Sequence, residues 1–174
     1  MYNTTTENET PRIYVADLAA YNNGKLHGVW VDATQDIDTI WDEVNKMLKN
    51  SPEGFAEEYA IHDFEGFGTY RMSEYEGLER TNNIALFIQE HGDVGLAALA
   101  YYNDLEDAKT AVEDNYHGCH DSEEAFAEEL YTSCYEIPEH LEYYIDYAKI
   151  ARDLFMGDYF AIKVGYQIHV FSCH

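Results

Sequence analysis

The sequence predicts an α+β fold, on the strength of three observations. Segments with alternating apolar and polar residues lie near both ends of the chain, and the segments between them carry apolar residues at helical spacing. Strands and helices do not alternate regularly, and no internal repeat is present. With 174 residues, of which 46% are hydrophobic and 15% aromatic, the chain is long enough to bury a core.

The N-terminal part is expected to form an antiparallel sheet with one helix. A strand starts at Arg12, turn residues at 22–24 reverse the chain, and residues 26–31 form the return strand. Apolar residues at a spacing of three to four predict a helix over 37–48. Residues 57–63 are predicted to add a third strand to the sheet.

The middle of the chain is expected to be helical. A first helix carries apolar residues on one face from Ile84 and ends at Gly92, because glycine commonly terminates helices. A second, more apolar helix spans 94–102. A third runs from Asp104 to about Tyr116, and the turn residue Gly118 lies beyond its end.

The C-terminal part is expected to contain helices followed by short antiparallel strands. One helix starts after Ser122, and another runs from Pro138 to Ala148. Apolar and polar residues then alternate over 160–164 and again over 168–171, with a glycine between the two segments. This pattern predicts a closing hairpin.

Capping residues support the predicted helix starts. Ser, Thr and Asp side chains accept hydrogen bonds from backbone N–H groups that have no partner in the first turn, and proline is favoured at the first helical position. The candidates are Thr34 and Asp36, Ser73 with Glu76 at capping-box spacing, Asp104, Ser122 and Pro138.

Acidic residues dominate the charge of the chain. Thirty-four acidic residues stand against ten basic ones, which gives a formal net charge of −24. Between residues 81 and 148 the only Lys or Arg is Lys109, against sixteen acidic residues. The alternative explanation is a merely soluble or salt-adapted surface, but ordinary surfaces mix both signs. The bias argues against direct binding of nucleic acid or anionic membranes and favours a basic protein partner.

These acids are expected to lie on the surface of a folded scaffold. Residues 57–79 contain seven acidic residues interleaved with eight aromatic or aliphatic ones, which a disordered acidic tail would lack. Carboxylates held in this way can substitute for the phosphates of B-DNA, which carries one charge per roughly 1.7 Å of axis. On that spacing the net charge corresponds to about 12 base pairs, or about 40 Å of duplex.

Signatures of catalysis or metal binding are weak. His117, Cys119 and His120 lie close together, but no second ligand pair stands at zinc-like spacing, so we favour an ordinary turn over a zinc site. His62 and Asp63 are neighbours on a predicted strand, where one should point inward and the other outward, so they should not form a dyad. No catalytic residue, metal site or cofactor is predicted, and we expect a protein that is not an enzyme.

The cysteines and the hydropathy predict a reduced, cytoplasmic protein. Cys119, Cys134 and Cys173 are too few and too irregularly spaced for a disulfide framework. The chain contains neither a signal peptide nor an apolar run of about 18 residues that could span a membrane.

Three segments resemble the ArdA family of antirestriction proteins. They are RIYVADLAAYNNGKLHGVW at residues 12–30, AIHDFEGF at residues 60–67 and YIDYAKIARDL at residues 144–154. The resemblance implies a DNA mimic that occupies the DNA-binding groove of type I restriction-modification enzymes, at their methyltransferase core, and so protects incoming mobile DNA. It also implies an elongated homodimer in which each chain has three small subdomains.

Our division of the chain agrees with that plan. A disordered polar extension at 1–10 is followed by an N-terminal α+β subdomain at 11–66, a helical middle subdomain at 67–107 and a C-terminal α+β subdomain at 108–174, which would make the dimer contact. The first border falls near Gly66 and Gly68, which are typical of a linker.

The resemblance also implies roles for individual residues. The segment 122–137 would correspond to the antirestriction segment of the family, with a candidate dimer contact or core at Phe126, Leu130 and Tyr131. The acids that would imitate phosphates are Asp63, Glu65, Glu74, Glu76, Glu79, Glu113, Asp114, Asp121, Glu123, Glu124, Glu128 and Glu129.

Two alternatives come from other classes of protein. A carboxylate-dependent or metal-dependent hydrolase would use some of the many acids together with the cluster of His117, Cys119 and His120. An acidic adaptor would present the same surface to another basic DNA-binding protein. Loss of activity with a chelator would identify the first alternative, and the identity of the partner would identify the second.

Overall fold

The structure, a computed structural model, describes residues 9–73 and 76–173. It confirms the predicted α+β class, with an antiparallel N-terminal sheet, a helical middle and C-terminal helices with antiparallel strands. The chain divides into two compact units, residues 1–92 and 93–174. The division into three subdomains stays a prediction, and most of the extension predicted at 1–10 lies outside the described residues.

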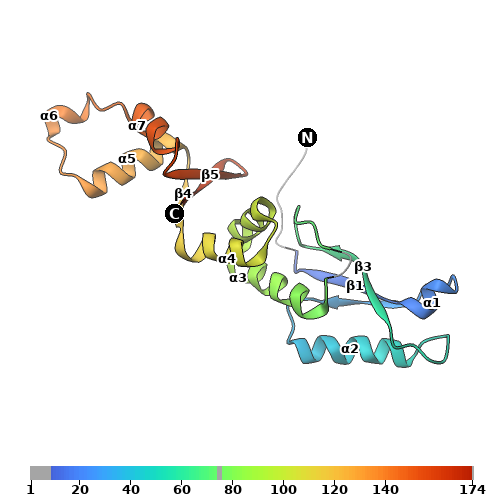
Figure 1. Ribbon diagram of the computed structural model, residues 1–174. Coiled ribbons are helices and arrows are strands. Elements are labelled where there is room, and N and C mark those ends of the chain that lie inside the picture. Colours follow the sequence, from blue (N-terminus) through green and yellow to red (C-terminus); the bar gives the residue numbers. More distant parts are fainter. Residues whose placement is uncertain (1–8, 74–75, 174) are drawn as a thin grey trace. The chain divides into compact units, whose positions relative to one another are not determined.

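The first unit is a three-stranded antiparallel sheet in the order β2-β1-β3, with helices beside it. Figure 1 shows α2 running along one face of this sheet. Its elements are β1 (Arg12–Asp17), α1 (Leu18–Asn22), β2 (Gly28–Asp32), α2 (Ile37–Lys49), β3 (Tyr59–Glu65) and the first part of α3 (Leu78–Tyr102).

The core of the first unit lies between the sheet and its helices. In the register, Ile13 stands between Val31 on β2 and Phe64 on β3, so the three share one face of the sheet. Ile13 and Val31 are buried with the apolar stripe of α2, which Asp36 caps as expected. The stripe consists of Ile40, Val44, Met47 and Leu48.

The first hairpin is wider than the sequence predicts. Instead of a simple turn between the two strands, Leu18–Asn22 forms the short helix α1. Asp17 is fully buried and caps this helix by accepting a hydrogen bond from the Ala20 amide at 3.1 Å. Burial alone would raise the pKa of the Asp17 carboxyl, but hydrogen bonds from Ser51 and from the α1 backbone lower it on balance.

The expectation that one of His62 and Asp63 points inward is wrong. Tyr14 pairs with Asp63, and Val15 pairs with Ile61, so His62 is the extra residue of a β-bulge. The bulge interrupts the alternation of the strand, and both side chains are exposed. The His62 ring contacts the ring of Tyr21, 4.6 Å away, which does not make a catalytic dyad.

Helix α3 begins later than its capping sequence. The carboxylate of Glu76 accepts a hydrogen bond from the Ser73 amide at 2.7 Å, which is half of a capping box, but the helix itself starts at Leu78. Gly92 interrupts α3 with φ of 56° and ψ of −133°, so the predicted stop at this glycine is confirmed. The chain passes from the first unit to the second at this residue.

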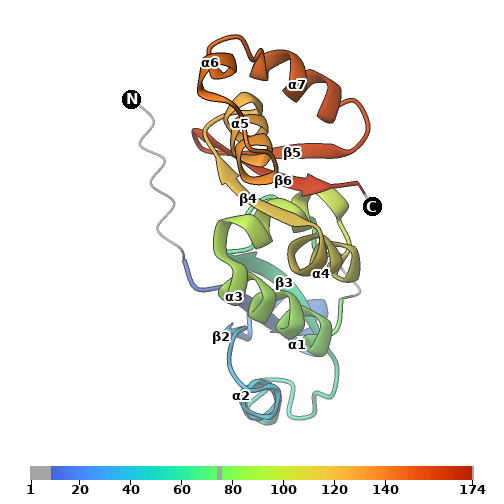
Figure 2. The same ribbon diagram turned by 90° about the vertical axis from the view of Figure 1, so that its left-hand side faces the viewer.

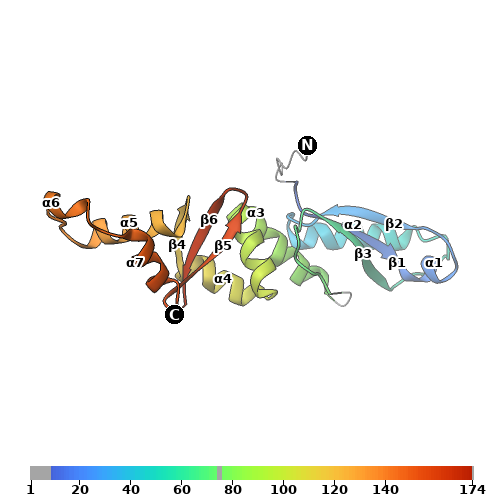
Figure 3. The same ribbon diagram turned by 90° about the horizontal axis from the view of Figure 1, so that it is seen from above.

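The second unit is also built on a three-stranded antiparallel sheet, in the order β4-β6-β5. Figures 2 and 3 show α5, α6 and α7 on one side of this sheet and α4 on the other. The elements that follow α3 are α4 (Leu105–Asp114), β4 (Tyr116–His120), α5 (Glu123–Cys134), α6 (Glu139–Glu142), α7 (Tyr147–Leu154), β5 (Tyr159–Val164) and β6 (Gln167–Ser172).

Two predictions for the second unit need correction. Residues 116–120 were expected to be a helix end and a turn, but they form β4, which pairs with β6. The single helix predicted from Pro138 to Ala148 is divided, because Asp146 leaves the helical conformation and caps α7 through the Lys149 amide at 3.0 Å. The closing hairpin with its glycine turn is confirmed.

Aromatic side chains cover both faces of the second sheet. On one face Phe160 stacks on Phe171 and on Tyr101, with ring centroids 5.4 and 5.1 Å apart. On the face toward α5, Phe126 contacts Tyr159 at 5.0 Å and Phe155 at 5.9 Å. These contacts anchor α5, with its acidic residues Glu123, Glu124, Glu128 and Glu129, to the sheet.

Candidate functional site

Three of the predicted acids in the first unit lie at its surface. Asp63 on β3 is exposed, and Glu65 forms an ion pair with Arg12 at 2.6 Å. Glu79, in the first turn of α3, accepts a hydrogen bond from the indole of Trp41 at 3.1 Å. Glu74 lies outside the described residues.

Glu76 differs from these acids because its side chain is only 5% exposed. Its carboxylate contacts Arg80 at 2.7 Å and accepts hydrogen bonds from the Ser73 amide and the Tyr70 hydroxyl. Burial and the negative charge of Glu76 raise the pKa of the Tyr70 hydroxyl, which therefore stays protonated as a donor. In this position Glu76 joins Tyr70 and Ser73 to Arg80 of α3.

The seven predicted acids of the second unit are all exposed. They lie at the end of α4, after β4 and along α5. Among the described residues, none of them forms an ion pair with Lys or Arg. Asp121 accepts a hydrogen bond from the Gln167 side chain at 3.3 Å, and Glu129 lies 3.4 Å from the His120 ring.

The acids at the two helix ends differ in their electrostatic environment. Glu123 and Glu124 occupy the first turn of α5, where the partial positive charge of the helix N-terminus stabilises them. Glu113 and Asp114 occupy the last turn of α4, which contains no basic residue. Carboxylates at a helix C-terminus oppose the helix dipole and destabilise the helix.

The histidines of β4 contact aromatic side chains, although His117 is exposed. The His117 ring contacts Tyr159 at 5.1 Å, and the His120 ring contacts Phe126 at 5.1 Å. His120 also shares a hydrogen bond with the backbone carbonyl of His117 at 3.1 Å. Within residues 9–73 and 76–173, no group of three or more His, Cys, Asp or Glu side chains is arranged to hold a metal ion.

The candidate dimer contact divides into a buried and a partly exposed part. Phe126 is 3% exposed and belongs to the core of the second unit, whereas Leu130 and Tyr131 are half-buried. The Tyr131 ring lies 5.5 Å from Tyr135, which is exposed. A dimer contact through Leu130 and Tyr131 stays a prediction.

His169 is half-buried and lies on β6, the central strand of the second sheet. The Tyr116 hydroxyl and the Nδ1 atom of His169 are 2.7 Å apart. Burial lowers the pKa of the His169 ring, although the nearby Asp93 raises it in part. Burial also raises the pKa of the Tyr116 hydroxyl. The pair is therefore neutral in the folded protein at neutral pH, which favours a structural role.

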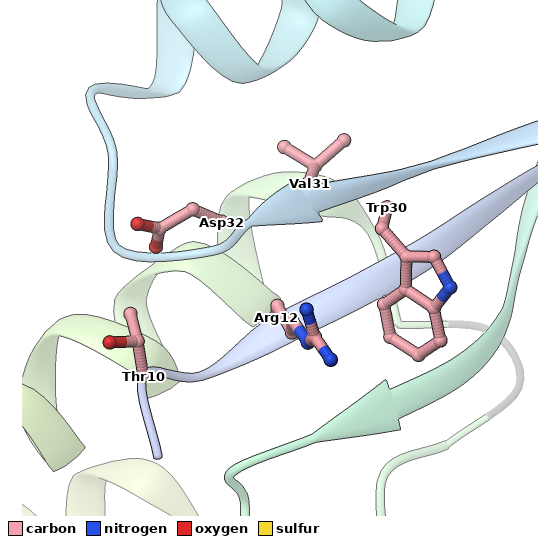
Figure 4. Close-up of a pocket in the computed structure, with 5 residues that line it drawn as sticks. All are labelled: Thr10, Arg12, Trp30, Val31 and Asp32. Carbon is pink, nitrogen blue, oxygen red and sulfur yellow. The ribbon is translucent and has the colours of Figure 1, made fainter. Parts of the chain in front are cut away.

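Sequence reasoning missed an exposed aromatic surface on the first unit. Trp30 and Tyr14 stand opposite each other on β2 and β1, on the face away from α2, and their rings are 5.6 Å apart. Arg12 lies beside Trp30, and Figure 4 shows both around a shallow pocket with Thr10, Val31 and Asp32. The alternation of Trp30 with the buried Val31 is the signal that could have identified this face.

The fold and its surface define a small, strongly acidic α+β protein. In the part of the chain that the structure describes, no helix is long and apolar enough to cross a membrane. The chain belongs to the ArdA antirestriction protein family, because the sequence model of that family matches residues 13–168. Membership implies an antirestriction function and interaction with restriction-modification enzymes. A search of curated proteins gave no match to this chain.

Proposed function

We propose that this protein blocks type I restriction-modification enzymes by imitating B-DNA and occupying their DNA-binding groove. Such a groove is lined with Lys and Arg, which gain affinity by pairing with phosphate charges. The protein would offer carboxylates in place of phosphates and would act by binding, without catalysing a reaction. Incoming mobile DNA would then escape cleavage while the enzyme is occupied.

The exposed acids of the second unit are the observation that carries this proposal. Seven carboxylates lie on one folded unit, and none has a Lys or Arg partner among the described residues. Their charges are therefore available to a basic partner. Because several of them stand on helices, they are already ordered, and binding does not have to order an acidic chain.

The position of Glu113 and Asp114 adds a second argument. At the last turn of α4 each carboxylate destabilises the helix by roughly 0.3–1 kcal/mol at low salt. A surface selected only for solubility could carry acids in first turns, where they stabilise the helix. Acids retained at an unfavourable position are expected when the carboxylates serve binding.

Competition with DNA tests the proposal directly. A labelled duplex is bound to the methyltransferase core of a type I enzyme, and the protein is titrated in at low and at moderate salt. We expect stoichiometric displacement that weakens as salt rises, because the contacts are electrostatic. Folded protein that fails to displace DNA at low salt would show that the acidic surface serves another basic partner.

Charge variants sharpen this experiment. A single Glu to Gln change at Glu123, Glu124 or Glu128 should weaken binding by only about 1.5-fold to fivefold, as exposed ion pairs do. The triple variant should lose about threefold to 125-fold, because the free energies of separate contacts add. Complete loss from one substitution in a folded variant would instead indicate a catalytic or metal-binding carboxylate.

A further inference from the structure

The outer face of the first sheet combines aromatic rings with charges of both signs. The antiparallel register places Trp30, Tyr14 and Asp63 in one row across the sheet, and Asp32, Arg12 and Glu65 in the next row. Residues directly opposite each other point to the same face. Because α2 packs on the opposite face, this one is open, and 38% of Trp30 is exposed.

Arg12 is the first residue of the central strand β1, between Asp32 of β2 and Glu65 of β3. Its guanidinium carbon lies 5.1 Å from the centroid of the Trp30 ring, in a cation–π arrangement. The same guanidinium contacts the carboxylate of Glu65 at 2.6 Å through both Nε and Nη2. The indole and the carboxylate thus form a cradle of the right size and charge for a guanidinium group.

Two depressions border Arg12. A depression of about 290 Å³ lies between Arg12, Trp30 and Asp32, and a second of about 230 Å³ lies between Arg12, Glu65 and Glu9. In Figure 4 the Arg12 side chain borders the first of these depressions next to the indole. A second side chain can therefore approach the cradle without displacing backbone.

The contact between Arg12 and Glu65 is easily exchanged. The Arg12 side chain is 55% exposed and that of Glu65 is 42% exposed. Ion pairs exposed to this degree add little to stability, because water and salt screen them. An arginine from another protein could replace Arg12 by making contacts of the same kind, while the displaced Arg12 side chain returns to water.

We propose that Trp30 and Glu65 form an arginine-binding site, which Arg12 fills in the isolated chain and which an arginine of a basic protein partner fills on binding. A planar guanidinium can stack on an indole ring and donate two hydrogen bonds to one carboxylate. The ammonium group of lysine is compact and strongly hydrated, so it makes both interactions less well. The site therefore selects arginine over lysine. The inference rests on the proposed function only in that the partner is basic.

Binding of labelled oligoarginine and oligolysine peptides of equal length tests the site without any restriction enzyme. Wild-type protein should bind oligoarginine more tightly than oligolysine. Trp30→Ala should weaken oligoarginine binding by about twofold to fivefold and leave oligolysine binding unchanged. Trp30→Phe keeps a ring and should keep most of the preference. Phe55→Ala removes another exposed aromatic side chain of this unit, which is 75% exposed, and should change neither affinity.

Arg12→Ala gives the more decisive result, because it should strengthen binding. Emptying the cradle should raise the affinity for oligoarginine by about twofold to fivefold more than the affinity for oligolysine. Lys25→Ala is the matched control, because Lys25 also pairs with a glutamate at 2.6 Å and its side chain is 52% exposed. It removes the same charge and should affect both peptides equally.

Two outcomes would overturn the proposal. One is an equal effect of Arg12→Ala and Lys25→Ala on both peptides, and the other is an unchanged arginine preference in Trp30→Ala. Circular dichroism establishes that each variant is folded. A positive peptide result with failed DNA competition would remove the type I enzyme as partner but keep the arginine site, and the reverse result would remove only the site.

Discussion

The acids at the ends of α4 and α5 allow the helix-dipole argument to be tested with one kind of substitution. Glu113→Gln with Asp114→Asn removes two negative charges from the last turn of α4, and Glu123→Gln with Glu124→Gln removes two from the first turn of α5. All four side chains are exposed and lack Lys or Arg partners among the described residues. The two double variants thus differ mainly in the partial charge of the helix end beside the substituted residues, which is negative in α4 and positive in α5.

The expected magnitudes follow from the interaction of one charge with a helix end, which is roughly 0.3–1 kcal/mol at low salt. The α4 variant should be about 0.6–2 kcal/mol more stable than wild type, and the α5 variant less stable by a similar amount. Relief of the general repulsion in a chain of net charge −24 shifts both values in the stabilising direction. The difference between the two variants, roughly 1–4 kcal/mol, is therefore the diagnostic quantity.

Urea unfolding followed by circular dichroism, at low and at high salt, measures this difference. The difference should shrink at high salt because exposed charges are screened. If both variants change stability equally, general repulsion alone governs these positions and the dipole reasoning is wrong. In the DNA competition assay the stabilised α4 variant should bind more weakly than wild type, which would show directly that these acids reduce stability in favour of binding.

Three further predictions concern stability. Asn82→Ala should destabilise the first unit by roughly 2–5 kcal/mol in urea unfolding, because the buried Asn82 amide donates to the carbonyls of Ala33 at 2.7 Å and Gln35 at 2.8 Å; an unchanged midpoint would contradict this. Gly28→Ala should lower the free energy of unfolding by about 1–3 kcal/mol, because the added Cβ atom would lie 2.6 Å from the Val15 carbonyl oxygen. Gly157→Ala is the control and should leave the free energy of unfolding nearly unchanged, because the space around Gly157 is open. His169→Gln should make the free energy of unfolding depend less on pH. The pKa of His169 is lowered in the folded protein, so the unfolded state takes up a proton more readily. The contribution of His169 to stability is therefore present above the ordinary pKa of 6.5 and is lost as the pH falls below it. Equal pH profiles for wild type and this variant would show that the ring does not contribute.

Local signals in the sequence predicted most of the regular elements. Asp36 and Ser122 are strong capping residues followed by apolar residues at helical spacing, and both helices start directly after them. The turn at Gly165 joins two segments of alternating residues, and the hairpin forms as expected. In each case the information lies within about ten residues of the element.

The elements that the sequence did not predict depend on distant contacts. Strand β4 contains two histidines, a glycine and no β-branched residue, so its strand conformation comes from pairing with β6 some fifty residues later. The bulge at His62 likewise depends on the register with β1. Helix α1 requires the buried cap Asp17, and burial of an aspartate is not evident from local composition.

The same limits apply to the candidate site. The abundance of acids and the absence of nearby bases were evident from the sequence, and the structure places the acids of the second unit at the surface. The burial of Glu76 was not predictable, because it depends on contacts with Tyr70 and Arg80 together. The arrangement of Arg12 between Trp30 and Glu65 required the register of three strands.

The two three-stranded sheets have a consequence for the behaviour of the protein in solution. Among the strands of residues 9–73 and 76–173, β1 and β6 are flanked by strands on both sides, whereas β2, β3, β4 and β5 are edge strands with backbone groups open to pairing with another chain. At neutral pH the large negative charge keeps such edges of neighbouring molecules apart. Near the isoelectric point of about 4.3 that repulsion vanishes, and we expect edge-to-edge association and precipitation while the sheets are still formed.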